Sequence, residues 1–397
     1  MRRWWRKAPA LAVLLLLLTG CWDLREMNQL ALVMAVGIDL AETPGRYLVT
    51  VQVARPGAGK GGRGGAGSGD ASGRKAVYIA SADGDTIFAA IRNLAQFTSR
   101  RIMWAHNNVI VIGEPLAREG ITPVIDFFTR NQELRMRTWV VVARGAEAQE
   151  IVSAQTGMET VPANSISAIL RHASLPGEAP RTDVSEVSHS FMNRELNTVI
   201  SAVRLKDRLV NEEEPQVELR GAAIFNGPRL AGYVESETGR GLLWLRREMS
   251  NAVITVPCPG GGGNMAVELR SPVSRVTPFL QEGRPVFLVT VRTEGWLSEQ
   301  DCTTPEMDSL ALKAMVEREM SAKIRGDIEQ TVAYLQEEIG VDGAGFGRRV
   351  HVEHPAWWRA HGDRWEEIFP ESPVEIQVRV RLSKMGIYTR PLQPQEP

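Results

Sequence analysis

The first half of the chain alternates short apolar runs with segments whose apolar residues recur at helical spacing. Runs rich in Val, Ile and Leu that end at Gly, Pro or polar residues are typical of β-strands. The first expected helix, which we expect Asp83 to cap, carries on one face Ile87, Ala90, Ile91, Leu94 and Ala95. The expected strands cover residues 30–40, 46–54, 76–80, 101–113 and 137–145, and further helices 120–130, 146–155, 162–172 and 182–199.

The second half has longer elements. Two short strands flank an Asn226-Gly227 pair, a strong signal for a hairpin turn. A helix over 236–250 follows, then strands at 252–256, 265–269 and 285–293, and one or two long helices over 305–339. The last strand, 374–386, alternates cleanly and places on its apolar face Val374, Ile376, Val378, Val380 and Leu382. Its other face, which should meet solvent or a partner, carries Glu375, Gln377, Arg379, Arg381 and Ser383.

This order of elements predicts an α+β or mixed α/β fold with some parallel strand pairing. The acidic, proline-containing stretch "NEEEPQ" at 211–216 is typical of a domain boundary. The segment "RPGAGKGGRGGAGSGDASGRK" at 55–75 contains a Gly59-Lys60 pair, but Gly61 follows where a phosphate-binding loop needs Ser or Thr. We therefore expect residues 55–75 to form a flexible loop.

The N-terminus has the pattern of an export signal. Four basic residues within Met1–Lys7 precede an apolar block at 8–18, which is shorter than the roughly 20 residues of a spanning helix. The block ends in Leu18-Thr19-Gly20-Cys21, the pattern of a bacterial lipobox. We expect cleavage after Gly20, which defines residues 1–20 as a lipoprotein signal peptide. Cys21 then carries S-diacylglycerol and N-palmitoyl groups, enough for stable membrane anchoring.

Export places the other two cysteines, Cys258 and Cys302, outside the cytosol, where a disulfide can persist. Both lie in loop-like stretches. A bridge between them would close a loop of about 45 residues and contribute roughly 4 kcal/mol on the chain-entropy model. Two free thiols explain the same sequence equally well, so the pairing stays open.

Charge and motifs give no support for an enzyme. The 46 basic and 47 acidic side chains nearly cancel, so no global field favours nucleic acid. No nucleophile elbow, zinc-protease, Cys-x-x-Cys or dinucleotide motif occurs, and we expect no catalytic residue and no cofactor. The best metal candidate is "HVEHPAWWRAH", with His351, Glu353, His354 and His361. Pro355 opposes the helix that would bring two of these histidines together, so we expect no metal either.

Two further features of this region have simple structural interpretations. "GAGFG" at 343–347 is interpreted as a turn that enters a strand. The aromatic residues Trp357, Trp358, Trp365 and Phe369 could stack on a ligand, but packing in a small core explains them better.

Five stretches together resemble one family, the Ger(x)C spore germination lipoproteins, which are the C subunits of nutrient germinant receptors. They are "GCWDLREMNQLALVMAVGID", "FFTRNQELRMRTWVVVARG", "GAAIFNGPRLAGYVESETGRGLLWL", "GFGRRVHVEHPAWW" and "FPESPVEIQVRVRLSKMG". The resemblance extends from Cys21 to about residue 392. Cys21 matches the lipid-bearing cysteine of the family, and Trp22 and Asp23 match the pair that follows it. The glycine-rich insert at 57–73 and the Cys258/Cys302 pair depart from the family pattern.

The resemblance implies three mixed sheet-plus-helix domains in an extended arrangement. With the boundaries above, these cover 21–210, 217–300 and 301–392. It further implies a non-enzymatic subunit, held by diacylglycerol at the outer face of the spore inner membrane. There it acts with integral-membrane A- and B-type subunits, and neither nucleic acid nor a small-molecule ligand of its own is expected.

The alternative hypothesis is a substrate-binding lipoprotein of an import system, which would share the lipobox. Such proteins usually have a polar spacer after the cysteine, whereas here an apolar run begins at Leu30, nine residues after Cys21. At ~3.3–3.6 Å per residue, the first strand starts within about 30 Å of the bilayer. That spacing favours a subunit held against membrane partners.

Overall fold

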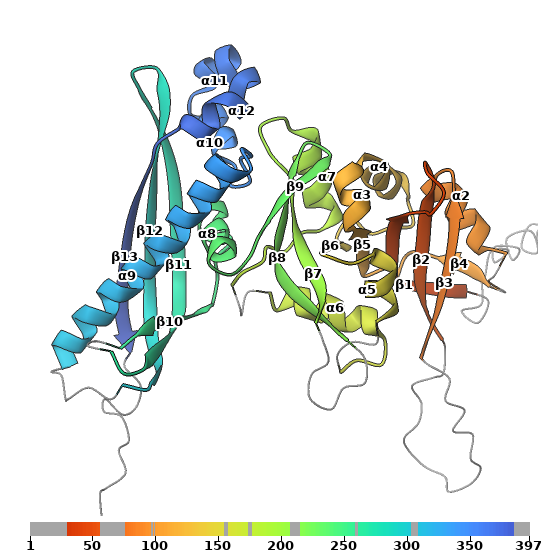
Figure 1. Ribbon diagram of the computed structural model, residues 1–397, viewed down its shortest axis with the longest axis horizontal. Helices are drawn as coiled ribbons and strands as arrows, with labels where there is room; N and C mark the ends of the chain where they lie inside the picture. The colour runs from red at the N-terminus through yellow and green to blue at the C-terminus, as the bar shows by residue number, and fades with distance from the viewer. Residues whose placement is uncertain are drawn as a thin grey trace, which may run out of the picture.

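The computed structural model describes residues 30–55, 76–96, 98, 100–154, 158–173, 177–206, 215–258, 261–302 and 309–384. The expected signal peptide, Cys21 and nearly all of the glycine-rich segment 55–75 lie outside these residues. The described residues form two β-sheets with helices against them (Figure 1). The fold is therefore α+β, as the sequence predicts.

The first sheet has nine strands with a parallel centre. The central strands β1, β5, β6 and β7 run parallel, and antiparallel strands extend the sheet at both ends. The strand order is β3-β2-β1-β5-β6-β7-β8-β9, and the short β4 also pairs with β1. The strands are β1 (Leu30–Leu40), β2 (Tyr47–Ala54), β3 (Val77–Gly84), β4 (Arg101–Met103), β5 (Val109–Gly113), β6 (Trp139–Ala143), β7 (Val199–Lys206), β8 (Gln216–Asn226) and β9 (Arg229–Val234).

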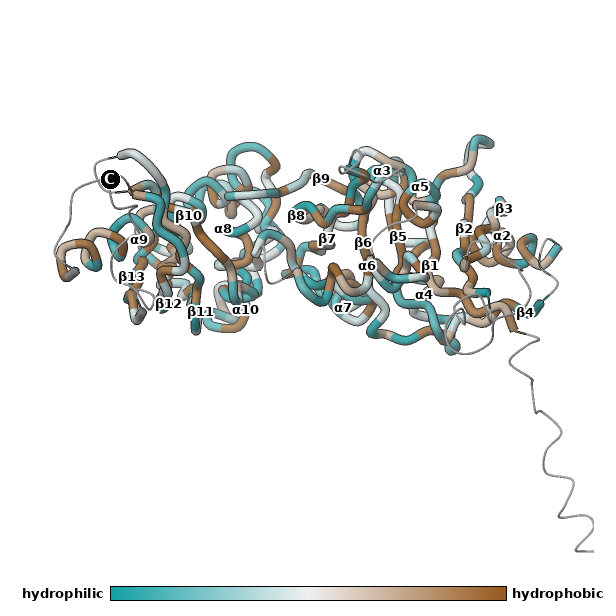
Figure 2. The backbone as a smooth tube through the Cα atoms, turned by 90° about the horizontal axis from the view of Figure 1, so that it is seen from below, coloured by the Kyte–Doolittle hydropathy of each residue, from teal (hydrophilic) through white to brown (hydrophobic). Residues whose placement is uncertain are grey.

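Helices cover both faces of this sheet, which is why its central strands are almost continuously hydrophobic (Figure 2). α2 (Ile87–Leu94), α3 (Glu114–Glu119), α4 (Thr122–Arg130) and α7 (Val184–Met192) pack on the face that contains Val36 and Ile110. α5 (Ala148–Ser153) and α6 (Pro162–Arg171) pack on the opposite face, against Val109 and Val141.

The second sheet has four strands in the order β10-β11-β12-β13. They are β10 (Val253–Pro257), β11 (Asn264–Gln281), β12 (Arg284–Gln300) and β13 (Val374–Lys384). Glu282 and Gly283 form the two-residue turn of the long β11–β12 hairpin, and both have positive φ, 51° and 79°, as a tight hairpin turn requires. β13 runs parallel to β12, so the chain between them must cross over the sheet.

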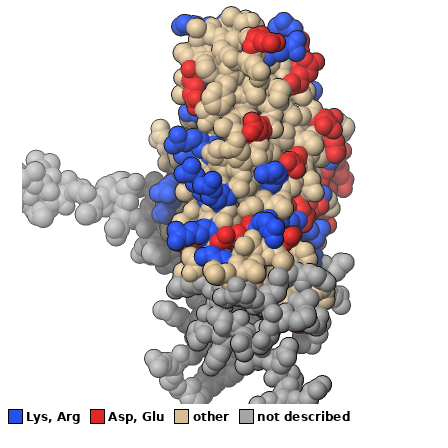
Figure 3. All heavy atoms as spheres, turned by 90° about the vertical axis from the view of Figure 1, so that its left-hand side faces the viewer, with Lys and Arg blue, Asp and Glu red and all other residues tan. Residues whose placement is uncertain are grey.

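The crossover and the preceding helix α8 (Ser236–Arg246) bury one face of the second sheet. The crossover contains α9 (Ser309–Ala333), η2 (Tyr334–Glu338), α10 (Phe346–Glu353), α11 (Pro355–His361), η3 (Gly362–Arg364), α12 (Trp365–Ile368) and η4 (Phe369–Glu371). On β13 the exposed residues are Glu375, Gln377, Arg379, Arg381 and Ser383, as the alternation predicts. The end of the molecule that carries β13 shows both acidic and basic side chains (Figure 3).

The molecule is elongated, with the two sheets at opposite ends and α8 beside the second sheet (Figures 1 and 2). The strand pairing divides the chain differently from the expected limits at 217 and 301. Residues 216–234 extend the first sheet because β8 pairs with β7, whereas 253–300 share a sheet with 374–384.

Several local predictions differ from the structure. Thr86 rather than Asp83 caps α2, and Ala95 lies exposed beyond its end. The expected strand 101–113 is two strands, β4 and β5, that pair with successive parts of β1 around buried Trp104. The expected helix 182–199 ends at Met192. The "GAGFG" turn opens helix α10, not a strand, because a carboxylate caps that helix from within the core.

Candidate functional site

Helix α8 lies between the first part of the chain, which forms the first sheet, and the long helix α9. Two of its glycines permit close packing on both sides. A Cβ atom at Gly239 would overlap with the backbone carbonyl of Glu178, from the segment before α7. A Cβ at Gly241 would overlap with the Thr331 hydroxyl and a backbone carbonyl of α9. The "GRG" sequence therefore lets one helix touch the first part of the chain on one side and α9 on the other.

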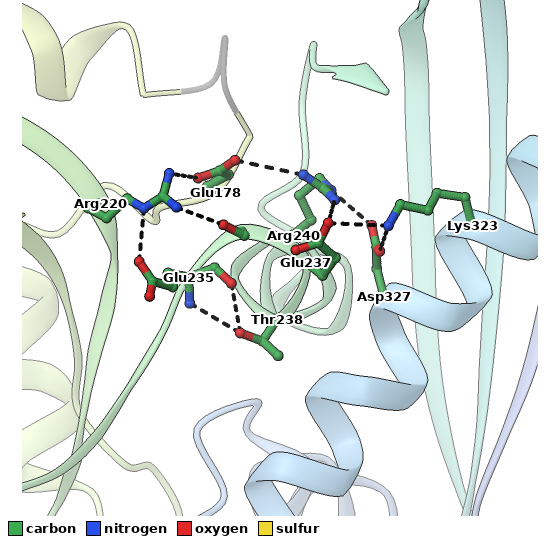
Figure 4. A network of polar contacts seen from close by, with 9 residues as sticks. Glu178, Arg220, Glu235, Glu237, Thr238, Arg240, Lys323 and Asp327 are labelled. Atoms are coloured by element: carbon green, nitrogen blue, oxygen red, sulfur yellow. Dashed lines mark hydrogen bonds and ion pairs between the residues drawn. The ribbon is translucent and has the colours of Figure 1, made fainter. Parts of the chain in front are cut away.

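Arg240, between these glycines, is the centre of a network of charged residues (Figure 4). Its Nε donates to Oδ2 of Asp327 on α9 at 2.9 Å, and Nη2 donates to Oε1 of Glu237 at 3.2 Å. Lys323 places Nζ 3.1 Å from Oδ1 of Asp327, whose side chain is 1% exposed. Burial disfavours the charge of Arg240, but the hydrogen bond and charge of Asp327 outweigh it, so the pKa of Arg240 is raised.

Glu178 extends the network to the first sheet. One of its carboxylate oxygens lies 3.7 Å from Nη1 of Arg240 and the other 3.7 Å from Nη1 of Arg220 on β8. Arg220 also donates from Nε to Glu235 at 2.8 Å, and Nη1 of Arg144 approaches the same carboxylate at 3.1 Å. Burial raises the pKa of Glu235, but the two arginines outweigh burial and keep it below its ordinary range. Alternating charges thus connect the first sheet to α9.

The buried carboxylate of Asp342 fixes the start of α10 beside the second sheet. Asp342 accepts hydrogen bonds from the backbone N–H groups of Gly345, Phe346 and Gly347 at 2.7–2.9 Å. Nε1 of Trp365 donates to the same carboxylate at 3.1 Å. Burial raises the pKa of Asp342 although these donors favour its charged form. A Cβ at Gly347 would lie 2.7 Å from Nε1 of Trp365, so glycine is required for this approach.

A second buried carboxylate, Asp39, fixes α5 to the first sheet. Oδ1 accepts from the N–H of Ala148 at 2.7 Å and Oδ2 from that of Gln149 at 2.9 Å. Burial raises the pKa of Asp39 to about 6, against the effect of these two hydrogen bonds. Neither buried aspartate is predicted by the sequence patterns above. Only Asp342 left a signal, an aspartate three residues before a Gly-Phe-Gly helix start.

Of the residues that the sequence singles out, Cys258 and Cys302 form a disulfide in the structure, with a Cα–Cα distance of 5.6 Å. Both cysteines are buried beside the second sheet. The bond joins the segment after β10 to the segment after β12. Cys21 lies outside the described residues, so its lipidation stays a prediction.

The metal candidates lie on α10, α11 and the residue that joins them, and their three histidines contact different neighbours. His351 approaches Glu195 at 3.4 Å, Nε2 of His354 lies 3.2 Å from the carbonyl of Pro278, and His361 stacks on Trp357. Within the described ranges no group of three or more His, Cys, Asp or Glu side chains is arranged to hold a metal ion.

The aromatic residues pack in the core. Trp365 and Phe369 are buried, and the ring of Trp365 lies 5.5 Å from that of Trp358 and 6.3 Å from that of Phe287 on β12. They hold the short helices of the crossover against the sheet. The prediction that this cluster packs a core is confirmed for these residues.

Comparison with known proteins identifies the class of protein. Residues 23–205 match the spore germination protein N-terminal domain, and residues 220–386 match the spore germination B3/GerAC-like C-terminal domain. The two matches cover most of the chain. It belongs to the Ger(x)C family of spore germination proteins.

Individual relatives extend over nearly the whole chain. Spore germination protein KC of Bacillus subtilis (strain 168) is 27% identical over 97% of this chain and 98% of its own. Putative spore germination protein YfkR from the same organism is 29% identical over 94% of each chain. The crystal structure of the GerBC protein superposes with a TM-score of 0.57 at 19% identity, over 91% of this chain and 100% of that chain, which shows the same fold.

The helices give no sign of a spanning segment in the part of the chain that the structure describes. None of them combines the length and apolar character that crossing a bilayer requires.

Proposed function

We propose that this chain is the lipid-anchored, non-enzymatic subunit of a nutrient germinant receptor, acting with integral-membrane A- and B-type subunits to trigger germination. Membership of the Ger(x)C family along most of the chain is the observation that carries the proposal. The two relatives named above are spore germination proteins, and their similarity to this chain extends over nearly their full length.

The N-terminal arrangement supports an anchored subunit. Cys21 ends a lipobox, and β1 begins at Leu30, only nine residues later. An extended chain of that length spans about 30 Å. Diacylglycerol on Cys21 would therefore hold the first sheet close to the outer face of the spore inner membrane, within reach of the extracellular surfaces of membrane partners.

The charged network around Arg240 forms the junction between the first sheet and α9, and it supports a role in which movement of one part of the chain is transmitted to the other. The residues of this junction are Arg144, Glu178, Arg220, Glu235, Glu237, Arg240, Lys323 and Asp327. A receptor subunit that contacts partners at one end needs a rigid connection to the rest of its structure. Arg240, Glu178 and Arg220 provide charged contacts between α9 and the first sheet, and Arg240 is only 13% exposed. We infer that a partner bound to one part of this chain moves the other part with it.

The experiment is co-isolation from detergent-solubilised spore membranes. A C-terminal affinity tag on the full chain should recover A- and B-type subunits, which mass spectrometry of the eluate identifies. The Cys21→Ala variant serves as the comparison, since it should fold normally, lose the acyl groups and leave the membrane fraction when the membranes are washed with high salt.

Recovery of the lipidated chain without either membrane subunit would contradict the proposed receptor. Retention of the Cys21→Ala variant in membranes washed with high salt, which screens contacts between arginines and lipid phosphates, would contradict the anchor. Tight binding of a nutrient to the purified mature chain would instead favour a substrate-binding lipoprotein, and calorimetry with the nutrients that trigger germination measures it.

A further inference from the structure

A large groove lies at the end of the molecule where the chain enters its first strand. It has a volume of about 980 Å³ and lies between α2, β4 and α4. Leu30, the first residue of β1, pairs with Arg101 of β4, and Arg101 lines the groove. α2 and β4 lie at the end of the molecule opposite to β10–β13 (Figure 1).

The groove combines exposed aromatic surface with arginines. The side chain of Phe88 is 53% exposed, and its ring lies 6.5 Å from that of Phe127 on the facing helix α4. The guanidinium of Arg92 lies over the Phe88 ring at 4.8 Å. An exposed aromatic ring can lie against an apolar layer while the guanidinium of a neighbouring arginine stays among polar groups.

Four arginines and three carboxylates line the groove, which gives its lining a net positive charge. Each lining carboxylate has an arginine partner: Asp85 lies 3.0 Å from Arg46, Asp126 2.8 Å from Arg130, and Glu133 3.9 Å from Arg101. Within the residues that the structure describes, Arg92 and Arg100 have no carboxylate partner. Their two positive charges are therefore available to an anionic group outside the chain.

We propose that this groove docks on the bilayer surface, with Arg92 and Arg100 on the phosphates of anionic lipids and Phe88 among the upper parts of the acyl chains. The inference rests on the lipid anchor proposed above. The nine residues from Cys21 to Leu30 keep the groove within about 30 Å of the acyl groups. Unpaired arginines beside exposed aromatic residues are typical of surfaces that lie in a membrane interface.

The test uses the full mature chain with Cys21→Ala, so that acyl groups do not dominate binding. Co-sedimentation should show binding to vesicles of phosphatidylcholine and phosphatidylglycerol in equal parts, and much weaker binding to pure phosphatidylcholine. The Arg92→Gln/Arg100→Gln double variant should weaken binding by about fivefold for each arginine removed. Phe88→Ser should weaken binding to the same vesicles.

Two matched controls lie at the opposite end of the molecule. Arg379→Gln/Arg381→Gln removes the same charge from the exposed face of β13. Phe279→Ser changes a residue of similar exposure, 49%, near the hairpin tip of β11. Both should bind vesicles like the parent chain, and circular dichroism checks that every variant is folded.

Equal binding to the two kinds of vesicle, or an equal loss in the variants and their matched controls, would overturn the proposal. The mass of the N-terminal peptide of the native chain reports lipidation separately. A chain that is lipidated and recovers its partners, but shows no groove-dependent vesicle binding, would remove this inference and leave the proposed function standing. Absence of lipid on Cys21 would instead contradict the anchor.

Discussion

Nε of Arg240 on α8 donates a 2.9 Å hydrogen bond to Asp327 on α9, 87 residues further along the chain. Asp327 is almost completely buried, and Arg240 is mostly buried. Arg240 also approaches Glu178, which belongs to the segment that precedes α7. One guanidinium therefore connects three segments far apart in sequence, and its removal should affect the junction as a whole.

We expect Arg240→Ala to lower the free energy of unfolding by about 3 kcal/mol, because it leaves the buried carboxylate of Asp327 with Lys323 as its remaining cation. Denaturant unfolding of the mature chain measures the change. Arg130→Ala is the control, since Arg130 pairs with Asp126 on an exposed helix surface and such pairs contribute at most about 1 kcal/mol. Similar losses in both variants would contradict a special role for the junction.

Gly241→Ala should destabilise the chain by about 3 kcal/mol, because the added methyl group would overlap with α9 and force the two helices apart. The control is Gly326→Ala in the middle of α9, where an added Cβ meets nothing within 4 Å. Since alanine favours helices, that control should stabilise by about 0.5–1 kcal/mol. The thermal and denaturant unfolding midpoints of the two variants should therefore shift in opposite directions relative to the parent. A shift in the same direction would contradict close α8–α9 packing.

The periodic elements could be predicted from the sequence because each is determined by its own residues. The hairpin at Asn226-Gly227, the helix expected over 236–250, which ends at Arg246, and the alternating strand β13 follow from turn chemistry and from the spacing of apolar residues. Strand β7 was missed because "VISAVRLK" follows a helix and a short turn with no strong break in hydrophobicity. The full lengths of β11 and β12 are not predicted because Ser271-Pro272 interrupts β11 with a register shift and Gly295 lies within β12, and both are typical of strand ends.

The junction could not be predicted from one sequence. Arg220, Arg240 and Asp327 are ordinary charged residues on amphipathic elements, and only the tertiary fold brings them together. The same holds for Asp39, which caps α5 across a separation of 109 residues. Buried charges of this kind carry no local signature, because their partners are chosen by packing rather than by spacing.

Reduction of the Cys258–Cys302 disulfide should lower the free energy of unfolding by about 4 kcal/mol on the chain-entropy model, since the bond closes a long loop. The Cys258→Ser/Cys302→Ser variant should unfold at a lower denaturant concentration than the oxidised parent and match the reduced parent. Thiol titration of the unfolded, non-reduced chain should detect no free thiol from this pair. Two titratable thiols, or identical stability of oxidised parent and variant, would contradict the bond.

Asp39 should give the stability of the chain a specific dependence on pH. Burial raises its pKa from 3.8 to about 6 in the folded state. Between these two values the folded chain binds more protons than the unfolded chain, so this group makes stability fall as pH rises. The contribution is fully present well below pH 3.8 and is lost by about pH 7, and the difference between these limits amounts to about 3 kcal/mol.

The comparison that isolates this contribution is Asp39→Asn. The amide cannot ionise, so the difference in unfolding free energy between parent and variant should change across the window from about pH 4 to pH 7, in favour of the parent at the acidic end. The amide also turns an NH₂ group toward one backbone N–H of α5, but that cost is constant with pH and cancels in the slope. Urea unfolding at several pH values measures the slope. If the free energies of unfolding of the two proteins changed with pH in the same way, Asp39 would have an ordinary pKa. Its charge at the start of α5 would then carry no cost from burial.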